Sequence, residues 1–207
     1  YRLTGGHGTG AEYAMRAEAE FMRGNIDAAE TLAHRAMFEA DSKNQSSIYQ
    51  CGLCVLACIA VFRGDEAKLF EVFFSVSERA AANTEDMCRY TQDMIFGYIY
   101  AFINRTDKIE GWLVSGNMGQ NKVAAMTLPF AYIVYARVLL ERFEYAKLLA
   151  LCPFACKMAE ASRSILPRIY FNIFSSCANM AIGNKEAAVG DLKKALSLAA
   201  SDRIYMP

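Results

Sequence analysis

Three cysteines stand at helical spacing in the first half of the chain: Cys51, Cys54 and Cys58. Residues three, four and seven apart lie on one face of a helix, so the three thiols would line up. Thiolates bind zinc and carry redox chemistry. A structural zinc site needs four ligands, however, and no second Cys-x-x-Cys pair or histidine lies nearby in sequence. Cysteine is also a small, readily buried apolar residue. We therefore favour core packing over a thiol-lined surface or a metal site, and we predict neither metal nor cofactor.

The glycine-rich start, Gly5 to Gly10, could cradle a phosphate only between a buried strand and a helix. Only four residues precede it, and no Lys-Ser/Thr pair accompanies it. We predict a flexible lead-in over residues 1–10, with Thr9 or Gly10 near the N-cap of the first helix. The two histidines, His7 and His34, have no nucleophile or carboxylate partner in sequence. Catalysis of the Ser-His or Cys-His kind is therefore not expected, and we predict that the chain is not an enzyme.

Composition excludes several classes of protein. The 207 residues carry 22 basic and 22 acidic side chains without a basic run, which disfavours direct nucleic-acid binding. Seven cysteines, an odd number placed in apolar stretches, fit a reducing cytoplasm better than a disulfide framework. The longest uncharged run, residues 44–62, holds about twelve apolar-rich residues, whereas a membrane span needs about 20. We predict a cytoplasmic protein that does not cross a membrane.

A short turn recurs along the chain at a fixed interval. Its clearest copies are Gly24-Asn25 and Gly183-Asn184, and weaker copies stand at Gly64, Asn104 and Phe143. These turn positions are separated by 40, 40, 39 and 40 residues (24, 64, 104, 143, 183). A period of this size is typical of helical repeat arrays. The predicted fold is therefore all-α, with about five antiparallel helix pairs that form a right-handed, tetratricopeptide-like superhelix over a single domain, residues 1–207.

Apolar spacing and capping residues place the helices of each pair. We expect a short second helix in the third pair and a break or kink at Pro153 in the fourth, with a new helix from Phe154 to Ser162. The predicted pairs are 11–23 with 27–40, 46–63 with 65–82, 85–103 with 108–114, 123–142 with 144–162, and 166–182 with 185–200.

Every predicted first helix has a small residue seven positions before the turn. These residues are Ala17, Ala57, Gly97, Ala136 and Ser176. A small side chain at this point lets the partner helix approach closely, as in tetratricopeptide repeats. The position six before the turn should then face the concave side of the array, and it holds Glu18, Cys58, Tyr98, Arg137 and Cys177. The position thirteen before the turn holds Ala11, Cys51, Thr91, Phe130 and Tyr170.

Four of these side chains could bind a peptide or a small polar ligand on a concave wall: Glu18, Tyr98, Arg137 and Tyr170. The alternative is that Glu18 and Arg137 are solvated charges at the rim, which is the commoner role of such residues. The sequence leaves both interpretations open.

Several stretches of the chain resemble the helical-repeat region of MalT-like regulators of the LuxR family. They are residues 5–19 (GGHGTGAEYAMRAEA), 23–25 (RGN), 29–36 (AETLAHRA), 129–135 (PFAYIVY), 144–146 (EYA) and 199–207 (AASDRIYMP). In that family an ATPase module precedes the repeats, a helix-turn-helix domain follows them, and the repeats sense an inducer. The resemblance implies a sensor and relay domain. Its partner would be a small-molecule inducer, a peptide or a protein.

Neither flanking module is recognisable in this chain, which lacks a Walker A motif and a helix-turn-helix pattern. DNA would therefore be bound only through a domain outside this chain. Because the sequence begins at Tyr1 without a methionine and stops at Pro207, we expect it to be a piece of a longer protein. The competing hypothesis is a tetratricopeptide-like protein–protein interaction scaffold without a small ligand.

Overall fold

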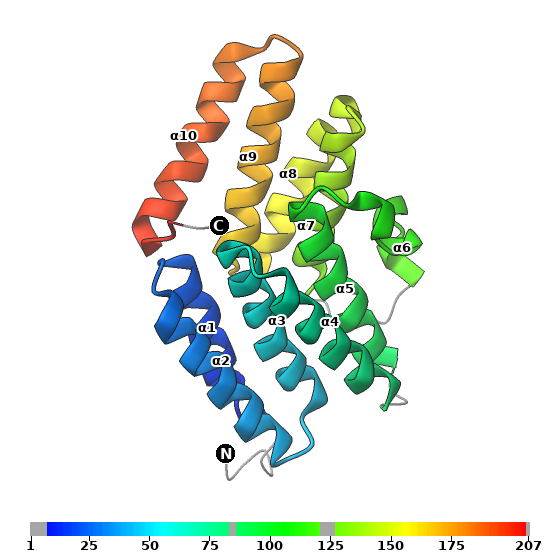
Figure 1. Cartoon of the computed structure of the whole chain (residues 1–207). Coiled ribbons are helices and arrows are strands. Elements are labelled where there is room, and N and C mark those ends of the chain that lie inside the picture. The colour runs from blue at the N-terminus through cyan, green and yellow to red at the C-terminus, as the bar shows by residue number, and fades with distance from the viewer. Residues whose placement is uncertain (1–7, 83–85, 121–126, 206–207) are drawn as a thin grey trace. The chain divides into compact units, whose positions relative to one another are not determined.

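The computed structural model describes residues 8–82, 86–120 and 127–205 (Figure 1). These residues form ten α-helices and two short 3-10 helices and contain no β-strand, which confirms the all-α prediction. The helices are α1 (Ala11–Met22), α2 (Ile26–Asp41), α3 (Ser46–Arg63), α4 (Glu66–Ala81), α5 (Asp86–Phe102), α6 (Gly111–Ser115), α7 (Leu128–Glu141), α8 (Tyr145–Ala161), α9 (Ile165–Ala181) and α10 (Lys185–Asp202), with 3-10 turns at Thr106–Lys108 and Met118–Gln120.

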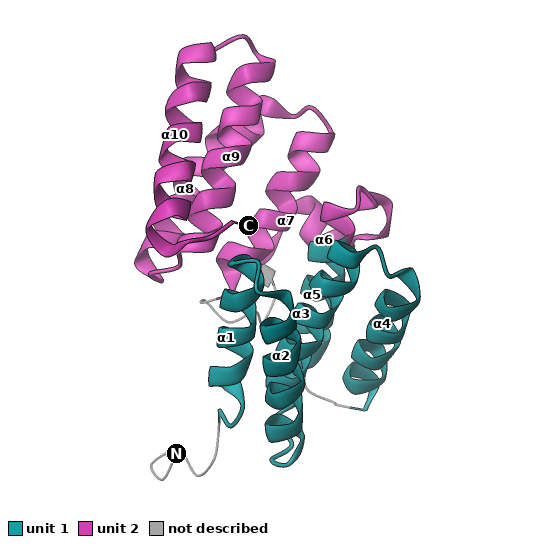
Figure 2. Cartoon of the chain, turned by 60° about the vertical axis from the view of Figure 1, so that its left-hand side comes forward, with its two compact units in different colours: residues 1–99, 206 teal, residues 100–205, 207 magenta. Residues whose placement is uncertain are grey.

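The chain divides into two compact units, coloured teal and magenta in Figure 2. Unit 1 extends to Ile99, and unit 2 covers Tyr100–Tyr205. In unit 1, α1 packs against α2 and α3, and α3 packs against α2 and α4. In unit 2, α7 packs against α8 and α9, and α9 packs against α8 and α10. Thus α1 and α7 each contact their own partner helix and the next first helix. The single domain and the superhelix stay predictions.

All five predicted turn positions adopt the left-handed backbone conformation. The φ angles are 80° at Gly24, 67° at Gly64, 58° at Asn104, 58° at Phe143 and 83° at Gly183. At each turn the following amide donates a hydrogen bond to the carbonyl five residues earlier, over 2.8–2.9 Å. This is the Schellman arrangement, which satisfies carbonyls that the helix end leaves without a partner. The turn prediction is confirmed at every copy.

A second series of left-handed turns follows three of the second helices, α2, α8 and α10. Asn44, Arg163 and Arg203 have φ angles of 53°, 53° and 56°. The next amide in each case donates to the carbonyl of an alanine five residues earlier, over 2.8–2.9 Å. Arg163 and Arg203 are again 40 residues apart. The sequence analysis missed this series because arginine gives no signal for a left-handed turn.

The five small residues before the first-helix turns are all buried, as predicted: Ala17, Ala57, Gly97, Ala136 and Ser176. The Ser176 hydroxyl donates a hydrogen bond of 2.8 Å to the carbonyl of Ala188 on the facing helix α10. A larger side chain at these positions would separate helices that pack closely.

One helix boundary was predicted wrongly. We expected Pro153 to interrupt the fourth pair, but α8 runs through it without a break. Proline removes only one amide donor from a helix, and the buried residues Leu148, Cys152 and Ala155 hold α8 against its neighbours on both sides of that position. Pro153 itself is exposed. The expected start of the fourth pair at Val123 lies outside the described residues, and α7 is described from Leu128.

Two glycines seven residues apart test the turn directly. A Cβ atom at either Gly183 or Gly190 would meet no atom within 4 Å, so only backbone conformation distinguishes them. Gly183→Ala should lower the free energy of unfolding by about 1 kcal/mol, because alanine is strained at positive φ. Gly190→Ala, inside α10, should raise it by about 0.5–1 kcal/mol. Urea denaturation measures both changes, and equal effects of the two substitutions would contradict the assignment of the turn.

Candidate functional site

Glu18 and the three spaced cysteines lie together in unit 1. Glu18 is on α1, the cysteines are on α3, and these two first helices pack against each other. The carboxylate of Glu18 is near enough to raise the pKa of both Cys51 and Cys54. The Cys54 and Cys58 thiols are hydrogen-bonded to each other. We call these four residues the first-helix face of unit 1. Glu18, Cys51 and Cys58 stand six or thirteen residues before a turn, at the two positions from which the predicted ligand residues were taken.

The thiols of Cys51 and Cys54 are held in the protonated form. Burial is the main cause that raises the pKa of Cys51 to about 12, followed by the charges of Cys54 and Glu18, although part of the residue reaches solvent. The hydrogen bond with Cys58, and then burial, raise the pKa of Cys54. Burial also raises the pKa of Glu18. A protonated thiol is a poor nucleophile and a poor metal ligand, so the face resembles neither a catalytic nor a redox centre.

Metal-binding geometry is not found in the part of the chain that the structure describes. No group of three or more His, Cys, Asp or Glu side chains in residues 8–82, 86–120 and 127–205 is placed to hold an ion. His34 is exposed on α2, and His7 lies outside the described residues.

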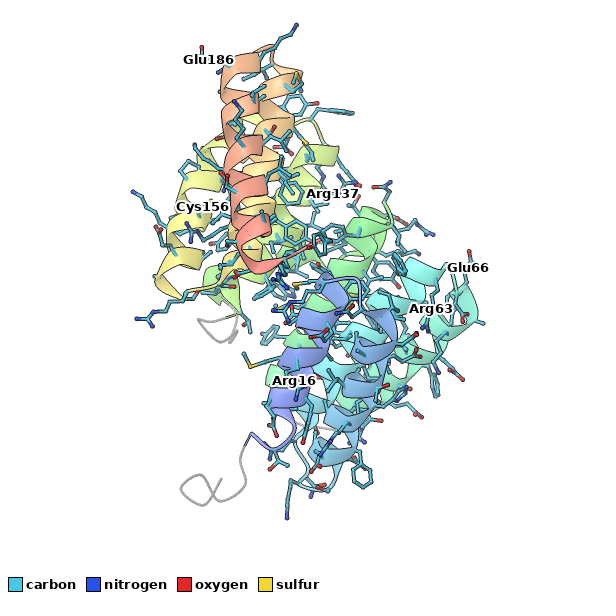
Figure 3. The ribbon with its side chains drawn as sticks, turned by 90° about the vertical axis from the view of Figure 1, so that its left-hand side faces the viewer. Arg16, Arg63, Glu66, Arg137, Cys156 and Glu186 are labelled. Carbon is cyan, nitrogen blue, oxygen red and sulfur yellow. The ribbon has the colours of Figure 1, made fainter. Side chains whose placement is uncertain are left out.

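Arg137 in unit 2 has an internal role that the sequence did not reveal. Its Nε donates to the carbonyl of Ala101 over 3.2 Å, and its terminal NH2 group donates to Oδ1 of Asn104 over 2.5 Å. The same NH2 group lies 3.6 Å from a carboxylate oxygen of Glu141. Arg137 extends from α7 (Figure 3) and so places a cation where the carbonyls of α5 end, which a helix dipole favours. Asn104 is itself the left-handed residue of that turn.

The two tyrosines of the predicted ligand set belong to different units. Tyr170 on α9 in unit 2 is only 3% exposed. Its ring stacks on Phe174 with centroids 5.8 Å apart and lies 5.3 Å from the ring of Phe102. Tyr98 on α5 in unit 1 is half-buried. Of the four predicted ligand residues, Glu18 and Tyr98 thus fall in unit 1, and Arg137 and Tyr170 fall in unit 2.

Among the described helices, α3 alone is long and apolar enough to cross a membrane. One such helix is weak support for a membrane span, because the core helix of a soluble protein has the same length and composition. Here α3 contacts α1, α2 and α4, and its buried residues include Leu53, Leu56 and Ile59. The structure therefore explains the apolar character of α3 by packing.

The chain was compared with protein-family models, curated proteins and solved structures, and none of them matches it. The resemblance to MalT-like regulators therefore stays a prediction that rests on the residues quoted above.

Glu18→Gln should stabilise the protein in a pH-dependent way. Burial raises the pKa of Glu18 in the folded state, so its ionisation opposes folding once the pH exceeds the pKa of the unfolded chain. The variant should melt at a higher temperature than the wild type at about pH 7.5, and the difference should shrink towards about pH 4. Calorimetry at both pH values measures this. Glu20→Gln is the control, because the Glu20 carboxylate accepts hydrogen bonds from Arg23 and Asn25 and its loss should not raise the melting temperature.

Arg137→Ala should lower the free energy of unfolding by about 1–3 kcal/mol, because it removes charge-assisted hydrogen bonds to the end of α5. Arg137→Lys should lower the free energy of unfolding by less than Arg137→Ala does. An ammonium group keeps the positive charge, but it cannot reach both acceptors with the geometry of a guanidinium. The exposed neighbour Arg142 provides the control variant, Arg142→Ala. If Arg137→Ala and Arg142→Ala have the same effect in urea denaturation, the internal role of Arg137 is refuted.

Proposed function

We propose that this chain is a helical-repeat binding module without catalytic activity, and that it serves as the sensor and relay part of a cytoplasmic LuxR-type transcriptional regulator. The observation that carries the proposal is the first-helix face of unit 1. Glu18 of α1 and the cysteines of α3 share one face, although they come from different helix pairs. Repeat proteins bind their ligands on surfaces of this kind, which successive first helices build together.

The finer architecture belongs to the same proposal. The constant turn interval and the order of contacts within each unit support a tetratricopeptide-like stack of helix pairs. In such a stack a ligand on the first helices touches several pairs at once. It can then shift an equilibrium between inactive and active arrangements, provided that it binds one of them more tightly. DNA binding would be performed by a separate helix-turn-helix domain of the regulator.

The alternative is a scaffold that binds a peptide or protein and has no small ligand. One observation favours it: Arg137 and Tyr170 are engaged within unit 2, Arg137 by the end of α5 and Tyr170 by two phenylalanine rings. Glu18 and Tyr98, the members of the predicted ligand set that lie in unit 1, would be the candidates for an inducer. A protein partner would instead use exposed aromatic side chains such as Phe70 and Phe74 on α4.

A thermal-shift screen separates the two proposals. The chain is melted with sugars, short peptides and small metabolites, each well above its expected dissociation constant. A ligand at about 100 times its dissociation constant adds about 2.7 kcal/mol, which should raise the melting temperature by roughly 5–10 °C. Glu18→Gln and Tyr98→Phe should reduce the shift, whereas Glu66→Gln on the exposed start of α4 should preserve it.

The outcomes of the screen are distinct. A small metabolite whose shift depends on Glu18 supports the sensor. A shift produced only by peptides, and lost in Phe70→Ser with Phe74→Ser, supports the scaffold. A shift that none of these substitutions alters would contradict both binding surfaces.

A further inference from the structure

The last helix, α10, carries an apolar stripe that faces solvent. The stripe consists of Val189, Leu192 and Leu196, which are 46%, 43% and 59% exposed. The spacing of three and four residues puts them on one face of α10. The face that packs on α9 is a different one, and it carries the buried residues Ala188 and Ala195. A surface helix normally exposes polar residues, so three apolar residues in line indicate a missing neighbour.

The 40-residue interval shows what this neighbour is in every earlier pair. Leu192 stands nine residues after its turn position, and the equivalent residues are Ala33, Phe73, Leu113 and Cys152. All four are buried, whereas Leu192 is exposed. Leu196 stands thirteen after the turn, and its equivalents include Met37, Ser77 and Cys156.

These equivalent positions contact the first helix of the next pair. A Cβ atom on Gly52 of α3 would lie 2.6 Å from Cγ of Met37 and 3.1 Å from the carbonyl oxygen of Ala33, so α2 and α3 are in close contact there. The ring centroids of Phe73 and Phe96 lie 4.5 Å apart between α4 and α5.

Polar contacts join the same positions. Gln92 of α5 donates to the hydroxyl of Ser77 over 3.3 Å. Asn172 of α9 contacts the sulfur of Cys156 over 4.0 Å. Leu192 and Leu196 of the stripe thus occupy the positions at which second helices receive the next first helix.

The backbone after α10 also follows the earlier pattern. The left-handed turn at Arg203, with the amide of Ile204 bonded to the carbonyl of Ala199, repeats the turns at Asn44 and Arg163. Those two turns lead into α3 and α9 within two residues. In sequence, Arg163-Ser-Ile-Leu-Pro recurs 40 positions later as Arg203-Ile-Tyr-Met-Pro. The arginine and the proline that lead into α9 therefore recur at the same spacing after α10.

We propose that the stripe on α10 is the docking surface for the first helix of a sixth helix pair, supplied by the same polypeptide after Arg203. That helix should carry a small residue about seven positions before its own turn, and the turn should hold glycine or asparagine roughly 40 residues after Gly183. The opposite end differs. On α1, the positions equivalent to Gly52 and Leu56 of α3 hold the exposed residues Glu12 and Arg16, so this face of α1 is polar.

The test compares residues 1–207 with the natural polypeptide extended by about 40 residues. Leu192→Cys is introduced into both, with Lys193→Cys on the adjacent exposed face as the matched control. Alkylation of each new thiol is followed by mass spectrometry. In residues 1–207 the two thiols should react at similar rates. In the extended chain Leu192→Cys should react at least roughly tenfold more slowly, and Lys193→Cys should be unchanged.

Four outcomes would overturn the proposal. The rate at Leu192→Cys could be the same in both polypeptides. It could already be slow in residues 1–207, which would mean that another part of this chain covers the stripe. It could slow with rising protein concentration, which would identify a second copy as the occupant. The coding sequence could also stop at Pro207.

Discussion

The hydrogen bond that closes each turn is the interaction on which the rest of the fold depends. An amide placed after a left-handed residue reaches back to a carbonyl five positions earlier, and this happens at every first-helix turn from Gly24 to Gly183. The bond ends the first helix at a turn that reverses the direction of the chain. The second helix therefore packs antiparallel against the first. Because the interval is constant, equivalent side chains return to equivalent places. The small buried residues from Ala17 to Ser176 follow from that regularity.

The same regularity explains why polar groups from distant parts of the sequence meet. Glu18 and Cys51 are separated by 33 positions, yet they influence each other because α1 and α3 are neighbouring first helices. Arg137 reaches the end of α5 for a similar reason, and there it satisfies a carbonyl and an amide oxygen at a turn. The contact between α1 and α3 lies within unit 1, and the contacts of Arg137 lie within unit 2.

Structural features that depend on residue type can be predicted from the sequence, whereas features that depend on packing cannot. Glycine and asparagine tolerate positive φ, so the turns at Gly24, Gly64, Asn104 and Gly183 could be located from the residue types and their spacing. Arg163 and Arg203 adopt the same conformation without any such signal, since their helices end where packing ends. Pro153 misled us because burial of the residues around it keeps α8 continuous. One partner of Arg137 is the backbone carbonyl of Ala101, which no side-chain pattern could indicate.

Removal of one complete repeat is the most direct test of the account. Deletion of residues 25–64 joins Gly24 to Asp65 and removes one complete interval of 40 residues. The turn at Gly24 then leads into α4, as the turn at Gly64 does in the full chain. The account predicts that this shortened chain keeps its helix content per residue by circular dichroism and melts cooperatively, because each pair contacts only its neighbours. Deletion of residues 25–44 removes only α2 with its turn and shifts the rest of the chain by half a repeat, so it should abolish cooperative melting. If both deletions fold equally well, or if both unfold, the chain is not built from interchangeable helix pairs and the account is wrong.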